Sequence, residues 1–409
     1  MNKKTENKAV SPWQWVPSLY FAQGLPYVVV MSVAVILFKR MGMSNTDIAL
    51  YTSGLNLPWV IKPLWSPLVD LLKTKRWWIV VMQILVGAGL AGIALTIQGP
   101  LAFRYCLAFM WLLAFSSATH DIAADGFYML GLNEKKQAYF VGIRSTFYRF
   151  AVIFGQGILV MFAGWLEQRY AREMPETAAI PQAWSLTFYL LTILFALLFV
   201  YHYLFLPHPR RDTCTLPPQQ ASAGRVFKEF LGTFTSFFQK KHIVSALIFI
   251  LLYRFAEAQL VKITSPFLLD TPATGGLALS TAEVGFIYGT IGVIALTIGG
   301  IVGGIAMARR GLKSCLWTMT IAMNLPNIVY LYLSFARPES IGIISGCVAI
   351  EQFGYGFGFT SLTYFMMLFS NGKHQTAHYA ICTGFMALGL MLPGMISGWI
   401  EESIGYRAF

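Results

Sequence analysis

A histidine and two aspartates interrupt one of the long apolar segments of the sequence. His120, Asp121 and Asp125 lie within "FSSATHDIAADGFYML", residues 115–130, whose surroundings are typical of a membrane-spanning helix. An ionised aspartate in mid-membrane costs roughly 2.5–3.5 kcal/mol on insertion scales, so such residues usually have partners and a function. Asp121 and Asp125 are four residues apart and share one face of a helix. Their chemistry predicts ion pairing, proton relay, or both.

Two arginines on the next apolar segment are the expected partners. If the two segments form an antiparallel hairpin that turns near residue 135, residues equally far from the turn lie at the same depth in the membrane. Asp121 is then level with Arg149. The same rule pairs Asp125 with Arg144, a pair that fits a static brace and a functional role equally well. At about 1.5 Å per residue the arginines lie roughly 9 and 16 Å into their helix. The deeper pair, beside His120, favours a carboxylate that releases its arginine and takes up a proton on a transport pathway.

Other apolar segments carry further charges. "LLYRFAEAQLVKITSPFLL" contains Arg254 and Glu257, three residues apart and able to pair within one helix, and then Lys262. Lys62 stands between two prolines, and Glu351 precedes the glycine-rich "FGYGFGF". Together with the hairpin residues, five buried bases face four buried acids. This small positive surplus favours an anionic substrate.

The composition places these residues in a polytopic helical membrane protein. Of 409 residues, 56% are hydrophobic and 12% charged, and the mean hydropathy is +0.60. Globular domains carry about 25% charged residues. Apolar segments long enough to cross a bilayer recur along the chain. We predict eleven spans, at 13–38, 47–69, 77–97, 101–131, 138–165, 184–206, 242–269, 280–307, 313–335, 339–370 and 377–400. No cleaved signal peptide is expected.

The net charge of +12 follows the predicted topology rather than a nucleic-acid surface. Eighteen basic residues fall in the N-terminal tail and the loops on the same side, and seven fall on the other side. The positive-inside rule therefore predicts a cytoplasmic N-terminus. We expect no nucleic-acid partner.

The two halves of the sequence echo each other. A Pro-, Gln- and Arg-rich stretch at 207–241 is interpreted as a cytoplasmic linker, with a short amphipathic helix around 226–238, between bundles at 1–206 and 242–409. "FAQ" at Phe21 matches "FAE" at Phe255, and "SNTDIA" at Ser44 matches "STAEVG" at Ser280. "MLGLNEKKQA" likewise matches "MLFSNGKHQTA", and "GWLE" matches "GWIE". Four matches in order indicate an internal duplication.

Two six-helix halves joined by a cytoplasmic loop resemble the layout of the major facilitator transporters. The segments "SPLVDLLKTKR" and "GGIVGGIAMARRGLK" are similar to the gating loop of that superfamily. Asp70, Arg309 and Arg310 are the gating candidates, with Arg144 as a structural one. Eleven spans then imply a twelfth helix, and "EESIGYRAF" is typical of its entry.

Enzymatic motifs are missing from the sequence. It has no P-loop, no Gly-x-Ser-x-Gly and no His/Cys metal spacing, so we expect neither an enzyme nor a metal or organic cofactor. The interior aromatic residues Tyr27, Trp59 and Tyr148 favour ordinary packing, with contact to a sugar ring as the alternative. The five scattered cysteines are interpreted as buried spacers.

The motifs "FAQGLPY", "LNLPWVIKPLWSPLVD", "HDIAADG" and "LLYRFAEA" resemble the AmpG-type muropeptide permeases, a family also similar to acetyl-CoA transporters. The resemblance covers Gln23 to about Gly405. It implies proton-driven import of N-acetylglucosaminyl-anhydro-N-acetylmuramic acid, with or without peptide. The resemblance also implies that Lys62, Asp121, Asp125 and Arg149 match the polar positions of the family.

This chain departs from the family pattern in ways that leave the ligand open. His120 stands where the family usually has a glutamine, and Arg144 is an additional charge. In "YRFAEA", Arg254 and Glu257 replace a lysine and an aspartate of the family pattern. The family's extra pair of C-terminal helices has no counterpart here. A free amino-sugar acid, a disaccharide and a peptide-bearing muropeptide therefore all fit.

The leading hypothesis is a monomeric proton symporter for anionic amino sugars or muropeptides in the bacterial cytoplasmic membrane. The alternatives are a transporter of another organic anion, acyl-CoA-like or a siderophore, and a non-transporting receptor of the same fold. Substrate contacts are predicted for Lys62, Arg149, Arg254, Tyr27, Trp59 and Tyr148. Proton coupling is predicted for Asp121, Asp125, Glu257, Glu351 and His120, with the proton gradient in place of a cofactor.

Overall fold

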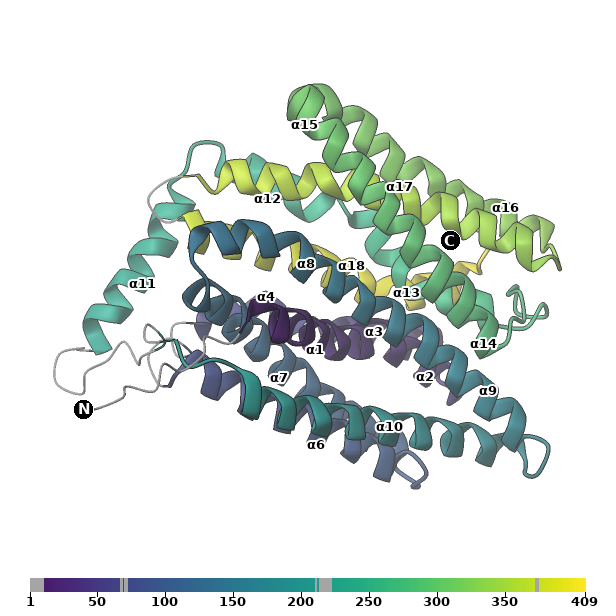
Figure 1. Ribbon diagram of the computed structural model, residues 1–409. Helices are drawn as coiled ribbons and strands as arrows, with labels where there is room; N and C mark the ends of the chain where they lie inside the picture. The colour runs from purple at the N-terminus through teal and green to yellow at the C-terminus, as the bar shows by residue number, and fades with distance from the viewer. Residues whose placement is uncertain (1–10, 67–68, 70–72, 210–211, 213–222, 372–374) are drawn as a thin grey trace.

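The chain forms a bundle of long helices (Figure 1). The computed structural model describes residues 11–66, 69, 73–209, 212, 223–371 and 375–409. All regular structure within these ranges is helical. Nine described helical segments are long and apolar enough to cross a membrane. The predicted all-α polytopic class is thereby confirmed, while the number of spans that cross the membrane stays a prediction.

The first six predicted spans coincide with helical segments. The first is α1 (Val16–Val28), η2 (Val29–Val33) and α2 (Ala34–Arg40), and the second is α3 (Asn45–Gly54), α4 (Leu57–Ile61) and η3 (Lys62–Leu64). Then follow α6 (Lys75–Thr96), α7 (Ala102–Gly131), α8 (Glu134–Val152), η4 (Ile153–Leu159), α9 (Val160–Tyr170) and α10 (Glu176–Phe205).

The remaining predicted spans are also helical. They comprise α12 (Ile243–Leu252), α13 (Phe255–Leu269), α14 (Thr281–Val284), η5 (Gly285–Gly292), α15 (Val293–Asn324), α16 (Ile328–Ala336), α17 (Ile341–Phe369) and α18 (Gln375–Ile404). The helix expected at 226–238 is α11 (Ala223–Phe238). The element α15 contains two helices, which belong to the predicted eighth and ninth spans and are separated by a kink at Gly311, where φ is 73°. Glycine adopts this left-handed conformation at little cost.

Irregular helix turns occur where the central helices approach one another. Pro26 interrupts α1 just before the π-helical segment η2. The π-helical segments η4 and η5 pack together, and a side chain at Gly289 would collide with the carbonyl of Gln156. Such π-helical turns often mark functional sites.

The ends of the bundle differ in which connections they carry. The N-terminal end holds residues 12–15, the connection from α7 to α8, and α11 (Figure 1). The opposite end holds the connections at 41–44, 270–280 and 337–340, together with the C-terminus. Helices from distant parts of the chain meet in between, since α18 runs beside α3 and α13. A pathway along the bundle is therefore lined by both halves of the sequence.

Candidate functional site

Two adjoining cavities lie between the halves of the bundle. The large cavity has a volume of about 720 Å³ and is lined from α1, α7, α8, α15 and α17. The small cavity, of about 240 Å³, is lined from α1, η2, α8, η4, α13, η5, α15, α17 and α18. They share Val152, Val293, Leu296 and Tyr355. Asp125 and Met367, on the wall of the large cavity, are partly exposed near helix ends, so this cavity opens toward the N-terminal end.

Asp121 is held by two side chains from the first two spans. Lys62 Nζ lies 2.8 Å from Asp121 Oδ2, and Gln23 Nε2 donates a hydrogen bond to Oδ1. The predicted Asp121–Arg149 pair is therefore wrong. Equal depth in a hairpin does not fix the direction of a side chain around its helix, and Asp121 faces α1 and η3, whereas Arg149 faces α15. The Asp121 carboxylate nevertheless lines the large cavity.

Asp125 forms the predicted pair with Arg144. Arg144 Nη1 lies 3.3 Å from Asp125 Oδ1, and the Tyr20 hydroxyl donates to the same oxygen at 2.9 Å. Arg144 also donates to the Tyr20 hydroxyl at 2.9 Å and lies over the rings of Tyr20 and Tyr128, 4.9 and 5.0 Å from their centroids. This network joins α1, α7 and α8 at the mouth of the large cavity.

Exchanging the charges of this pair should preserve the fold. Asp125→Arg or Arg144→Asp alone places two like charges together and should lower the free energy of unfolding by about 1–3 kcal/mol, since a charged group loses its partner. The double exchange should restore at least half of that loss. Thermal unfolding of the purified proteins in detergent measures the effect. A double variant as unstable as the worse single variant would show that the pair does not brace the helices.

Arg149 has no partner for part of its guanidinium. It lines the large cavity, and its buried Nη1 lacks a hydrogen bond to any residue that the structure describes. Its Nη2 would lie 3.6 Å from a side chain placed at Gly300, so the guanidinium reaches across to the second half of the bundle. Asp121, Asp125 and Arg144, the other charged residues on this wall, are paired. The large cavity therefore presents one uncompensated positive charge.

The small cavity contains the predicted pair within α13. Arg254 donates to the Glu257 carboxylate at 2.8 and 3.0 Å, which confirms that the two residues pair, and to the Tyr355 hydroxyl at 2.8 Å. Lys262 lines the same cavity and is 1% exposed. Tyr27, on α1, completes this wall and packs edge-on against Trp59 with ring centroids 5.1 Å apart.

Several predicted site residues lie away from both cavities. His120 is 3.1 Å from Gln83 Nε2, on the side of α7 that faces α6, because successive residues on a helix point about 100° apart. Glu351 is buried against Gln352 and Tyr330, at 2.9 and 3.3 Å. The structure therefore places neither His120 nor Glu351 on the wall of either cavity.

Four other described candidates line neither cavity, namely Lys62, Trp59, Arg309 and Arg310. Trp59 packs behind Tyr27, while Tyr148 lines the large cavity directly. Arg309 and Arg310 are exposed beside the bend at Gly311. Asp70 lies outside the described residues. The functional roles of all these residues stay predictions.

The structure adds site residues that the sequence reasoning did not assign. Tyr20, Gln23 and Tyr355 each hold a charged side chain in place, and Lys262 lines the small cavity. The signal for Gln23 was the repeat, since it occupies the position of Glu257 in the second half. The signal for Lys262 was its charge inside the apolar span at 242–269, whereas Tyr20 and Tyr355 have no comparable signal in the sequence.

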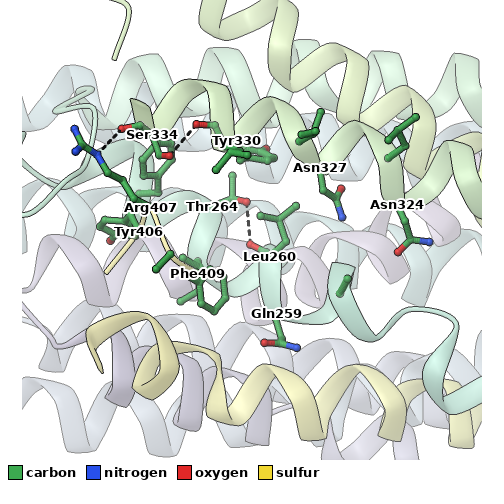
Figure 2. A pocket seen from close by; sticks show the side chains of 17 residues that line it. Gln259, Leu260, Thr264, Asn324, Asn327, Tyr330, Ser334, Tyr406, Arg407 and Phe409 are labelled. Carbon is green, nitrogen blue, oxygen red and sulfur yellow. Dashed lines mark hydrogen bonds between the residues drawn. The ribbon is translucent and has the colours of Figure 1, made fainter. Parts of the chain in front are cut away.

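A third cavity, of about 520 Å³, lies between α13, α16 and the C-terminal residues (Figure 2). Leu325, Ile328 and Leu331 on its wall are 62%, 59% and 47% exposed, so the cavity opens sideways toward lipid. The polar groups on its wall include Gln259, Asn327 and Arg407, and it contains no buried ion pair of the described residues (Figure 2). It shares no lining residue with either of the other two cavities.

The opposite end of the bundle is closed by two reciprocal contacts. Gly164 of "GWLE" packs against Ala282 of α14, where Thr281 donates to Glu167 at 2.7 Å. In the corresponding contact Gly398 of "GWIE" packs against Asn45. Asn45 donates to Glu401 at 2.6 Å. The repeated motifs thus dock each half onto the first helical turn of the other.

Further polar contacts reinforce this closure. Lys39 lies 2.7 Å from Asp270, linking the ends of α2 and α13, and Arg40 lies 3.1 Å from Glu167. The Tyr406 hydroxyl donates to Asp270 at 2.5 Å. Burial and the Asp270 carboxylate raise the pKa of Tyr406, so its hydroxyl remains a neutral donor. We name the Gly164–Ala282 and Gly398–Asn45 contacts with their hydrogen bonds the reciprocal closure.

These features define a membrane transporter, and the sequence comparison gives its family. A profile of the Major Facilitator Superfamily matches residues 18–398, so the chain belongs to that superfamily. It is 24% identical over 398 residues to the anhydromuropeptide permease of Escherichia coli K12, covering 96% of this chain and 74% of the relative. It is 25% identical over 402 residues to a Rickettsia conorii protein named AmpG 4, covering 96% and 90%. The resemblance to AmpG-type permeases is thereby confirmed.

Solved structures agree on the fold. A bacterial homologue of the human lysosomal transporter Spinster, in an inward-facing and unoccupied conformation, superposes with a TM-score of 0.69 at 15% identity, covering 95% of this chain and 81% of that one. A D-xylose–proton symporter gives a TM-score of 0.68 at 12% identity, with coverage of 96% and 90%. The chain is a multi-pass membrane transporter rather than an enzyme.

Proposed function

We propose that this protein imports an anionic amino-sugar fragment of the cell wall, of the N-acetylglucosaminyl-anhydro-N-acetylmuramic acid type, by proton symport. Import would proceed across the bacterial cytoplasmic membrane with the N-terminus in the cytoplasm. The observation that carries the proposal is the unpaired Arg149 guanidinium in the large cavity. The relative named anhydromuropeptide permease supports this ligand class. Arginine binds a carboxylate through a planar pair of donors.

The proposed mechanism is alternating access between the two halves. With the N-terminal end cytoplasmic, the described conformation faces inward, because the large cavity opens there while the reciprocal closure holds the other end. The substrate carboxylate binds Arg149, and Tyr148 on the same wall offers an aromatic face to a sugar ring. Asp121, on the cavity wall, takes up the coupled proton and releases Lys62.

Uptake in bacteria that lack their own permease tests the proposal. Cells with this protein should accumulate radiolabelled N-acetylglucosaminyl-anhydro-N-acetylmuramic acid, and a protonophore should abolish accumulation. Arg149→Gln should weaken uptake about 10- to 100-fold, because a hydrogen bond to a charged group contributes about 1.5–3 kcal/mol.

The matched control is Arg172→Gln, at an exposed arginine in the connection after α9, which should leave uptake unchanged. Absent uptake by wild-type protein that is present in the membrane would refute this ligand class. Uptake that survives Arg149→Gln undiminished would remove Arg149 from the binding site.

A further inference from the structure

Lys262 is a buried cation without a counter-charge. Its side chain is among the largest that are fully buried, at 1% exposure. No hydrogen bond or ion pair joins its ammonium to another residue in the described part of the chain. Buried charges in membrane proteins are normally paired, and unpaired ones mark ligand or ion pathways. Lys262 therefore needs a partner that is not among the residues around it.

The aliphatic part of the Lys262 side chain is packed between helices, and the residue lines the small cavity. A side chain at Gly394 of α18 would lie 3.4 Å from Lys262 Cγ and 2.6 Å from Ser53 Oγ of α3. The aliphatic stem is thus packed between α13, α18 and α3, and Lys262 lines the small cavity. The buried Ser53 hydroxyl also lacks a hydrogen-bond partner among described residues. This hydroxyl lies beside the Lys262 stem and is not on the wall of the small cavity.

The charges around Lys262 do not neutralise it. Arg254 and Glu257, the other charged residues on the wall of the small cavity, are occupied with each other at 2.8 Å. The small cavity thus has a surplus of one positive charge. The adjoining large cavity has its own surplus at Arg149. Two unpaired cations therefore stand along one continuous pathway.

We infer that Lys262 is a second anion-binding residue, and that the preferred substrate carries two anionic groups, one for Arg149 and one for Lys262. The inference rests on the proposed function and deepens it. A lysine ammonium binds a carboxylate as a point charge with three hydrogen-bond donors. Among cell-wall fragments, a peptide-bearing muropeptide supplies the second carboxylate, whereas the bare disaccharide has only one.

Binding to the purified transporter tests this inference with two probes. One is N-acetylglucosaminyl-anhydro-N-acetylmuramic acid, with one carboxylate, and the other carries an L-alanyl-D-glutamyl dipeptide, with two. Wild-type protein should bind the dipeptide form at least tenfold more tightly by calorimetry. Lys262→Met should remove that preference and leave the affinity for the bare disaccharide within about twofold, while Lys262→Arg should retain the preference.

Two outcomes would overturn the role of Lys262. One is an unchanged preference in the Lys262→Met protein, and the other is an equal loss of affinity for both probes. The matched control is Lys241→Met, at an exposed lysine before α12, which should behave as wild type.

A measurement without substrate separates the binding role from a structural one. Because Lys262 has no partner, Lys262→Met should unfold at the wild-type temperature or higher. A fall in Tm of more than 5 °C would mean that Lys262 stabilises the fold, and would overturn the inference.

Failure of the proposed function would be seen separately. If neither muropeptide binds wild-type protein, citrate and acetate at equal ionic strength become the probes. A citrate-dependent rise in Tm that Lys262→Met lacks would uphold the anion site, and an equal rise in both proteins would overturn it.

Discussion

The Asp121→Asn transporter should move substrate without concentrating it. An asparagine cannot take up and release a proton, so uptake should stop when the internal and external concentrations are equal. In the wild-type protein each coupled proton should support about tenfold accumulation per pH unit of gradient, since one pH unit corresponds to about 1.4 kcal/mol. Accumulation of labelled substrate in membrane vesicles with an imposed pH gradient measures this difference.

Exchange provides the control for this variant. Counterflow of labelled against unlabelled substrate needs no net proton movement, so Asp121→Asn should retain it within a fewfold of wild type. The substitution also leaves Lys62 without its ion-pair partner, 2.8 Å away in the wild-type protein. The double variant Asp121→Asn with Lys62→Met removes both charges, and it should show the same loss of accumulation. Wild-type accumulation in either variant would take Asp121 out of proton coupling.

The fold could be predicted from the sequence because its signals are local or periodic. Each predicted span coincides with helical segments, since continuous apolar stretches must satisfy their backbone hydrogen bonds internally in lipid. The Arg254–Glu257 pair was also predictable, because residues three apart on a helix are neighbours. The break between the eighth and ninth spans was predictable too, since the kink at Gly311 falls between the predicted spans at 280–307 and 313–335.

The candidate site was predictable only in part. Equal depth in the α7–α8 hairpin identified the Asp125–Arg144 pair but misplaced Asp121, whose partner Lys62 comes from another span. Depth along a helix follows from residue counting, whereas the direction of a side chain toward a third helix follows from tertiary packing. Lys62 reaches Asp121 because the second span is broken between α4 and η3, next to Pro63. No pattern within one segment encodes such a contact.

Replacing a glycine of the reciprocal closure by a larger residue should shift the transporter toward the conformation in which this end is open. Gly398 leaves no room for a side chain against the backbone of Asn45, so Gly398→Val should push α18 and α3 apart at this end. Overpacking costs about 1–3 kcal/mol, and only the closed conformation bears this cost. The population of that conformation relative to the open one should therefore fall about 5- to 150-fold.

Spin labels at Arg172→Cys and Glu339→Cys, both exposed at the closed end, report the separation of the halves. Gly398→Val should lengthen the distance between them and slow substrate uptake at least fivefold. Gly346→Val is the matched control, because no atom lies within 4 Å of a side chain placed there. An unchanged distance distribution in Gly398→Val would mean that this contact does not keep the end closed.

The internal repeat extends this expectation to the first half. Gly164 meets Ala282 as Gly398 meets Asn45, and the two contacts close the same end from opposite sides of the pathway. If the halves move as rigid bodies, neither contact can open while the other stays closed. Gly164→Val should therefore lengthen the label distance in the same direction, and the double variant should add little once the closed conformation is depleted. Two independent, additive distance changes would instead mean that each contact bends its own helix.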